Sequence, residues 1–221
     1  MEIALLHTAD VHVATFDALF DSLHVGANIT HLVRPDLLED ARAYGLDSVQ
    51  AHTIAALQTL SGADAVICTC STLGPLADQM ARDAPHILRI DRPMMETACK
   101  TGPDILVAIC LESTRQSTLA LLQECAAERG RAIRPQVVLC ASAWACFENG
   151  DTQGYAAEIA DAVRNALKSG AKPDCILLAQ ASMTVAEEPL ADVGVPVMSS
   201  PLMAAKQAAA IATSHQAENS S

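Results

Sequence analysis

The chain has 221 residues, and 51% of them are hydrophobic although only three Phe, two Tyr and one Trp occur. A core of this size built from aliphatic side chains is typical of parallel sheets covered by helices. The formal net charge of −12 disfavours nucleic acid or an anionic membrane as a partner, because both are negatively charged. We see no signal-peptide pattern and no apolar run that could span a bilayer, and we therefore expect a cytoplasmic protein.

Strand-like runs alternate with helical patterns along the whole chain. The strand-like runs end near Leu6, Val33, Cys70, Ile90, Cys110, Leu139, Gln180 and Met198. The helical patterns cover roughly 12–23, 35–61 with a break at Gly45, 75–83, 93–101, 115–129, 142–169 with a break at Gly150, 183–191 and 201–213. This alternation predicts an α/β fold with parallel sheets. The polar segment 215–221 predicts a disordered tail.

The second half of the chain repeats the first. Residues 174–183 match residues 64–73 position for position, so that Gln180 stands where Cys70 stands in the first half. Each half holds four strands, and right-handed crossovers place the strand ends of each half on one rim. We therefore predict two pseudosymmetric four-stranded parallel-sheet α/β domains with the active site in the cleft between them. The expected domains are 1–97, with the helix at 200–213 packing back on it, and 98–199.

Cys70 is the main candidate for a reactive group. It follows the apolar run Ala65–Ile67 and precedes a helix start near Pro75. Ligands of open parallel sheets bind at the carboxyl ends of the strands. A helix starting near Pro75 also directs N–H groups and its positive dipole end at this turn, which favours the thiolate. Cys68, one pleat earlier, fits a core position better. The other cysteines that we expect in the core are Cys99, Cys110, Cys125, Cys146 and Cys175.

Polar side chains gather at the same strand ends. The candidates for contacting a ligand are His7, Thr8, Ser71, Thr72, Thr114, Ser117 and Ser182. Hydroxyls and loop N–H groups beside a thiol suit a small carboxylate. His7 fits a ligand contact and a histidine satisfied within the protein equally well. Asp91 and Arg92 likewise fit either a surface ion pair at a turn or a role in the cleft.

The chemistry is predicted to need no cofactor and no metal. No glycine-rich phosphate loop follows the first strand. The lysines all fall away from the rim, where pyridoxal phosphate would need one. A metal site built from His7, Asp10 and His12 matches no established ligand spacing.

The stretches 68–74, 90–98, 177–183 and 195–201 resemble the aspartate/glutamate/hydantoin racemase superfamily, which includes arylmalonate decarboxylase-like and maleate isomerase-like enzymes. The resemblance implies a pair of pseudosymmetric α/β domains and, as its members are often dimers, a homodimer. In its racemases one cysteine removes the α-proton as a thiolate, and a second cysteine returns a proton from the opposite face. Cys70 matches the first cysteine, and Gln180 stands in place of the second. The regions where relatives hold a substrate carboxylate match Thr114 and Ser117 and, in the other half, Ser71 and Thr72.

An amide such as that of Gln180 neither donates nor accepts a proton near neutral pH. We therefore expect a cofactor-independent racemase- or isomerase-type enzyme that acts on an amino acid or dicarboxylic acid, with Cys70 as base or nucleophile and Gln180 in the catalytic site. A one-cysteine lyase of the decarboxylase kind is an alternative, and a non-catalytic protein that binds a small acid is another. Turnover that is lost on Cys70 alkylation favours an enzyme, whereas stabilisation by a ligand without turnover favours a binding protein.

Overall fold

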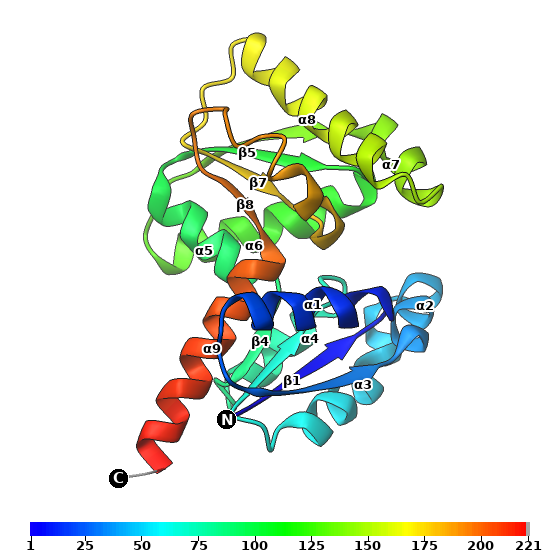
Figure 1. The fold of residues 1–221 in the computed structure, drawn as a ribbon, viewed down its shortest axis with the longest axis vertical. Helices are drawn as coiled ribbons and strands as arrows, with labels where there is room; N and C mark the ends of the chain where they lie inside the picture. The colour runs from blue at the N-terminus through cyan, green and yellow to red at the C-terminus, as the bar shows by residue number, and fades with distance from the viewer. Residues whose placement is uncertain (220–221) are drawn as a thin grey trace. The chain divides into compact units, whose positions relative to one another are not determined.

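The computed structural model describes residues 1–219, and their side chains as far as residue 217. The chain forms two units, one of residues 1–91 together with the chain from Pro201 onward, and one of Arg92–Ser200 (Figure 1). Each unit holds a four-stranded sheet, with strand orders β2-β1-β3-β4 and β6-β5-β7-β8. Every strand pair is parallel. The predicted α/β class with two four-stranded parallel sheets is confirmed.

In the first unit, β1 and β3 are the central strands. Leu6 of β1 pairs with Cys68 of β3, and His7 pairs with Val33 of β2, so the carboxyl ends of these strands share one edge. The bounds are β1 (Glu2–His7), β2 (Asn28–Val33), β3 (Ala65–Cys68), β4 (Ile87–Arg89), α1 (Val11–Ser22), α2 (Pro35–Tyr44), α3 (Leu46–Leu60), α4 (Gly74–Ala81) and α9 (Ser200–Asn219). The predicted break at Gly45 separates α2 from α3, where its φ of 89° suits glycine best.

The second unit repeats this plan. Asp64 in the first unit accepts a hydrogen bond from the N–H of Glu2 at 2.8 Å, and its repeat partner Asp174 accepts one from the N–H of Asp104 at 2.9 Å. The bounds are β5 (Asp104–Ile109), β6 (Arg134–Leu139), β7 (Cys175–Leu178), β8 (Val197–Ser199), α5 (Arg92–Thr101), α6 (Arg115–Glu128), α7 (Ala141–Glu148), α8 (Thr152–Lys168) and the 3₁₀ helices η1 (Glu112–Thr114) and η2 (Ala181–Ala186).

The structure differs from the predicted elements in two places. The prediction of a helix at 183–191 is wrong, because the 3₁₀ helix η2 and turns occupy this stretch. Pro189 has no backbone N–H to donate to a helical hydrogen bond. The tail expected to be disordered is helical as far as Asn219, and His215 contacts the carboxylate of Asp64 at 3.3 Å. Residues 220 and 221, the end of that predicted tail, lie outside the described residues.

The helix α5 belongs to the second unit, so the boundary expected between residues 97 and 98 falls inside it. Arg92 at the start of α5 binds Glu124 at 2.6 Å and Glu128 at 3.2 Å, both on α6. These ion pairs place α5 with the second sheet from its first residue.

Buried ionic contacts fix the end of β4. The Arg89 guanidinium donates to both carboxylate oxygens of Asp91, at 2.6 and 2.9 Å, and to Asp78 at 2.9 Å. Arg89 and Asp91 are both buried. Asp91 is therefore neither a surface group nor the partner of Arg92. A Cβ added to Gly74 would lie 2.6 Å from the Arg89 guanidinium, so the start of α4 also depends on this arrangement.

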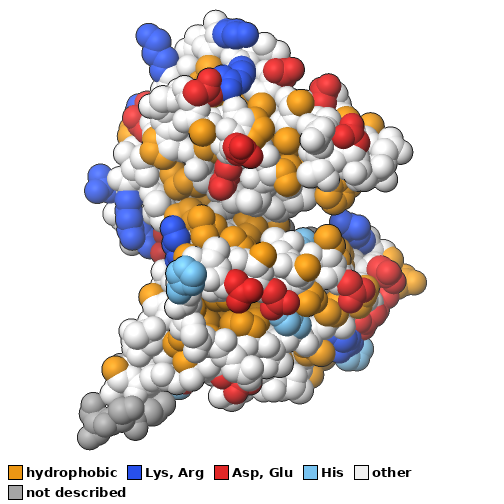
Figure 2. All heavy atoms as spheres, viewed as in Figure 1, with side chains coloured by type: hydrophobic (Ala, Val, Ile, Leu, Met, Phe, Trp, Pro, Cys, Tyr) orange, Lys and Arg blue, Asp and Glu red, His pale blue; other side chains and the backbone are white. Residues whose placement is uncertain are grey.

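Acidic side chains are spread over the surface that Figure 2 shows. Several surface arginines pair with carboxylates, including Arg134 with Asp104 and Arg164 with Asp192. Within residues 1–219, no helix combines the length and the apolar character that crossing a membrane requires.

Replacing Asp91 by Ala is expected to lower the free energy of unfolding by about 3–5 kcal/mol, because the buried Arg89 guanidinium then lacks the carboxylate that it pairs with at this position. The matched control is Asp36→Ala, which removes an exposed carboxylate paired with Arg34 and should change the free energy of unfolding by less than about 1 kcal/mol. Urea unfolding at pH 7 measures both. Equal, small losses for the two variants would contradict a structural role for the buried cluster.

Candidate active site

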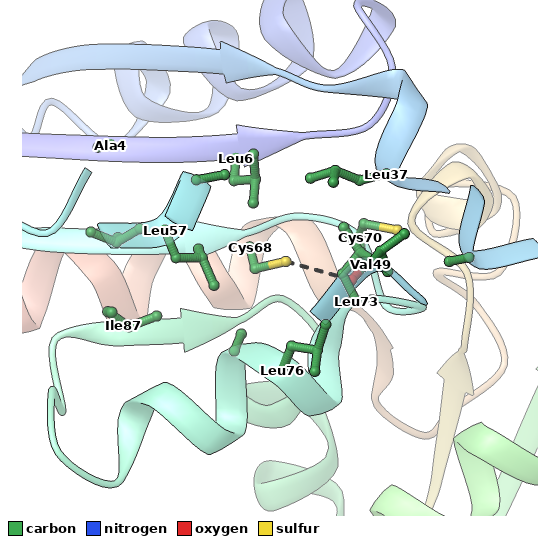
Figure 3. Packing of buried hydrophobic residues seen from close by; sticks show 14 of the residues in the cluster. Ala4, Leu6, Leu37, Val49, Leu57, Cys68, Cys70, Leu73, Leu76 and Ile87 are labelled. Atoms are coloured by element: carbon green, nitrogen blue, oxygen red, sulfur yellow. Dashed lines mark hydrogen bonds between the residues drawn. The ribbon is translucent and has the colours of Figure 1, made fainter. Parts of the chain in front are cut away.

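Cys70 lies two residues beyond the end of β3, just before the turn that leads into α4. Figure 3 shows it at the edge of the apolar cluster, beside Val49 and Leu73. Its exposed fraction is 8%, whereas Cys68 is 0% exposed. The Cys68 thiol points at the carbonyl oxygen of Cys70, 3.7 Å away, and burial raises its pKa to about 12. Cys68 is thus a core cysteine, as expected.

The turn after Cys70 offers unpaired backbone donors. The N–H groups of Leu73 and Gly74 donate to the carbonyl oxygens of Cys70 and Ser71, at 3.1 and 3.2 Å. The N–H groups of Cys70, Ser71 and Thr72 form no hydrogen bond with any other described residue. Successive backbone N–H groups in a turn can bind an anion. The side chains of Ser71 and Thr72 are exposed at the same turn.

His7 is occupied on both ring nitrogens. Its Nδ1 lies 2.8 Å from the Thr69 hydroxyl oxygen, and its Nε2 lies 2.8 Å from Nδ1 of His31. The residue is fully buried. This geometry leaves no ring nitrogen for a ligand. The adjacent Thr8 is nearly buried, and its hydroxyl makes no hydrogen bond within the described part of the chain.

In the second unit, a hydrogen bond orients the Gln180 amide. Its Oε1 accepts the backbone N–H of Cys110 at 2.7 Å. Its Nε2 group has no hydrogen-bond partner among residues 1–217 and remains a free donor. The Tyr155 hydroxyl lies 2.9 Å from Ser182 and 3.4 Å from the Cys110 sulfur. Gln180 therefore presents its N–H groups rather than its oxygen.

The sequence does not reveal the contacts of Cys110 and Tyr155 at this strand end of the second unit. Cys110 was expected only as a core residue, although it follows β5 as Thr8 follows β1 in the first half. Tyr155 comes from α8, 45 residues further along the chain than Cys110. No local sequence pattern connects the two.

Two other candidates direct their hydroxyls at the backbone. The Thr114 hydroxyl donates to the carbonyl oxygen of Leu111 at 2.7 Å, and that of Ser117 donates to Thr114 at 3.1 Å. A ligand would have to replace these hydrogen bonds to receive either proton. No cluster of three or more His, Cys, Asp or Glu side chains in the described chain has the geometry to hold a metal ion.

Burial divides the thiols into two groups. It raises the pKa of Cys68, Cys125, Cys140 and Cys175 to about 12, and it also raises that of Cys99 and Cys110. Cys146 on α7 was expected in the core but is only half-buried. Cys70 is the most exposed of the cysteines at the strand ends. It and Cys146 are therefore the two thiols most open to reagents.

Residues 22–208 match the model of the Asp/Glu/Hydantoin racemase family, and the chain belongs to this family. A glutamate racemase isoform from Bacillus anthracis has a similar structure, with 16% identity, a TM-score of 0.68 and coverage of 96% of this chain and 81% of that one. The aspartate racemase of Picrophilus torridus follows at 14% identity, with a TM-score of 0.64 and coverage of 97% and 94%. An arylmalonate decarboxylase shares 15% identity, with a TM-score of 0.61 and coverage of 96% and 91%. No curated protein sequence matches the chain.

Mild iodoacetamide treatment at pH 7 should label Cys70 and Cys146 before the six thiols whose pKa burial raises, because alkylation needs an accessible thiolate. Peptide mapping by mass spectrometry gives the order. In a Cys146→Ser variant, the first label should be at Cys70 alone. Faster labelling of Cys68 or Cys140 would place the reactive thiol elsewhere.

Proposed function

We propose that the protein is a cofactor-independent isomerase-type enzyme that moves a proton at the carbon next to the carboxylate of a small amino or dicarboxylic acid. Membership of the racemase family supports the reaction class. The observation that carries the proposal is the Cys70 thiol at the end of β3, beside three unpaired backbone N–H groups. This combination supplies a base and an anion site in one turn.

In the proposed reaction, the N–H groups of residues 70–72 bind the substrate carboxylate. The Cys70 thiolate removes the proton from the neighbouring carbon, and the C–H bonding electrons form the double bond of an enediolate. The carboxylate oxygens carry the new negative charge, and the same N–H groups stabilise it. The Cys70 thiol then returns a proton to the same face of the carbon, which exchanges the hydrogen and restores the thiolate. The mirror-image acid forms more slowly, when water gives a proton to the opposite face and the thiol passes its own proton to the hydroxide that is left.

Gln180 has a binding role in this proposal. Its oriented Nε2 donor suits a carboxylate oxygen, and an amide cannot carry the proton that a second cysteine would carry. Thr8 and the Ser71 and Thr72 hydroxyls are further donors. Proton transfer through Cys70 alone takes place on one face of the substrate carbon, so efficient two-faced racemisation is not expected.

Decarboxylation is a second candidate, and the fold shared with an arylmalonate decarboxylase favours it. One thiol is sufficient for this reaction. A carboxylate leaves as carbon dioxide, its C–C bonding electrons form the enediolate, and the Cys70 thiol gives its proton to carbon. Water then returns a proton to the thiolate.

Cys70→Ala should lower turnover at least about 100-fold, the usual contribution of a proton-transferring group. The screen covers small amino, hydroxy and dicarboxylic acids, with hydrogen exchange in D₂O, enantiomer ratio and carbon dioxide release as readouts. Cys146→Ala is the control, since it removes the other accessible thiol and should leave turnover unchanged. Both variants should melt cooperatively.

Full turnover by Cys70→Ala would overturn the mechanism. Acids that raise the melting temperature of the unmodified protein without any turnover would instead identify a binding protein.

A further inference from the structure

Four side chains in the first unit are joined in a continuous row by hydrogen bonds, which we call the polar chain. Asp17 Oδ1 on α1 lies 3.0 Å from His31 Nε2 on β2, His31 Nδ1 lies 2.8 Å from His7 Nε2 on β1, and His7 Nδ1 lies 2.8 Å from Thr69 Oγ1. The exposed side-chain fraction falls from 51% at Asp17 to 15% at His31. His7 and Thr69 are buried. The chain thus leads from the surface to the residue before Cys70.

The donors and acceptors of this chain allow few proton arrangements. The Asp17 carboxylate only accepts, so His31 Nε2 carries a proton in every arrangement. The Thr69 hydroxyl has one proton and two acceptors in reach, namely His7 Nδ1 at 2.8 Å and the Leu6 carbonyl oxygen at 3.0 Å. One proton must also lie between His7 Nε2 and His31 Nδ1, because two facing lone pairs would repel.

Two arrangements place a proton in each of the three contacts between these four side chains while His7 stays neutral. In the first, Thr69 donates to His7 Nδ1, His7 Nε2–H donates to His31, and both rings are neutral. In the second, His31 carries protons on both nitrogens and donates to His7 Nε2, while His7 Nδ1–H donates to Thr69, which donates to Leu6. The two rings together hold two N–H protons in the first arrangement and three in the second, so they differ by one proton taken from water.

The surroundings of His7 disfavour a charged ring at this position. The titratable groups that face His7 are His12 and Asp17 from α1 and His31 from β2. Burial lowers the pKa of His7 to about 3, with further lowering by His31 and His12, and the Asp17 charge only partly opposes this. A charged His7 is therefore disfavoured, and both arrangements keep this ring neutral.

The fold does not require this polar chain. The repeat places Ile109 of β5, Val137 of β6 and Ala179 after β7 where the first unit has His7, His31 and Thr69. The second unit thus builds the same sheet with apolar side chains at these positions. Buried polar groups stabilise a fold less readily than apolar packing unless every group is paired. A structural explanation alone therefore does not account for the histidines.

We propose that Asp17, His31, His7 and Thr69 form a two-state positioning relay for the segment that carries Cys70. Protonation of His31 reverses the tautomer of His7 and turns the Thr69 hydroxyl from His7 to the Leu6 carbonyl oxygen. Because Thr69 immediately precedes Cys70, the protonation state of the partly buried His31 affects the segment that carries the reactive thiol. These are positioning residues that make no contact with substrate, and their effect on turnover rests on the proposed function.

Histidine ring ¹⁵N NMR between pH 5.5 and 9 tests the relay without any substrate. Neutral His7 should carry its proton on Nε2 at the basic end and on Nδ1 at the acidic end, and the change should coincide with protonation of His31. His86 is the internal reference, because its Nε2 faces the Ser61 carbonyl oxygen at 3.1 Å and should keep Nε2–H whenever it is neutral. One unchanging His7 tautomer over this range, or a charged His7, would overturn the relay.

Two variants separate the relay from a packing effect. Asp17→Asn removes the charge that favours protonated His31, so the tautomer change should move to lower pH. His31→Gln keeps hydrogen-bonding groups but takes up no proton, so His7 should hold one tautomer at all pH values. An unshifted change in Asp17→Asn, or a remaining change in His31→Gln, would contradict the assignment.

The coupling to Cys70 has its own readout. The pH dependence of Cys70 alkylation should contain a step at the pH of the tautomer change, and the alkylation of Cys146 should not. Thr69→Ser should keep the step, whereas the nearly isosteric Thr69→Val should lose it. A step that survives in Thr69→Val would show that the relay does not act on the thiol. Loss of the proposed enzymatic function leaves these results interpretable, since neither readout uses turnover.

Discussion

The parallel pairing of β1 with β3 is the contact on which the first unit's candidate site depends. The register that places Leu6 opposite Cys68 also leads the Thr69 N–H to the Leu6 carbonyl oxygen at 3.0 Å. After this hydrogen bond the chain enters a turn in which the N–H groups of residues 70–72 are unpaired. The same register brings the Thr69 hydroxyl to His7. A shift of one residue would turn these side chains to the opposite face of the sheet.

The second unit shows which of these features belong to the fold and which do not. The N–H of Ala179 reaches the Ala108 carbonyl oxygen at 3.0 Å, as that of Thr69 reaches Leu6. The backbone plan is therefore shared, while the side chains at the strand ends differ. A thiol in one half corresponds to an oriented amide in the other. Two halves with one backbone plan but different strand-end chemistry are the basis for proposing that proton transfer is one-sided.

Much of the fold could be predicted from sequence because local sequence patterns indicate most of its helices and strands. Short apolar runs alternate with helical periodicity, and the glycines at 45 and 150 stand where helices end. The stretch 183–191 does not form the expected helix: its apolar spacing resembles that of a helix, but Thr184 and Pro189 favour turns. The tail is helical and not disordered as expected, because its polar side chains make contacts with the first unit that composition does not reveal. One of them joins His215 to Asp64.

The candidate site could be predicted only for residues whose role depends on their neighbours in sequence. The position of Cys70 follows from its own neighbours in sequence. The partners of His7 do not, because His31 lies 24 residues away on β2, and Asp17 approaches His31 from α1. The sequence around a histidine on a buried strand does not reveal which group will satisfy each ring nitrogen. The orientation of the Gln180 amide likewise depends on a backbone N–H 70 residues away.

The central claim is that Cys70 alone carries the proton. The most direct measurement is the stereochemistry of deuterium incorporation at the carbon next to the carboxylate, for whichever acid the protein turns over in D₂O. The account predicts deuterium on one face only, and some two-faced exchange when Gln180→Cys supplies a second thiol. Equal incorporation on both faces by the unmodified protein would contradict this claim, because a second group would then have to transfer a proton to the opposite face.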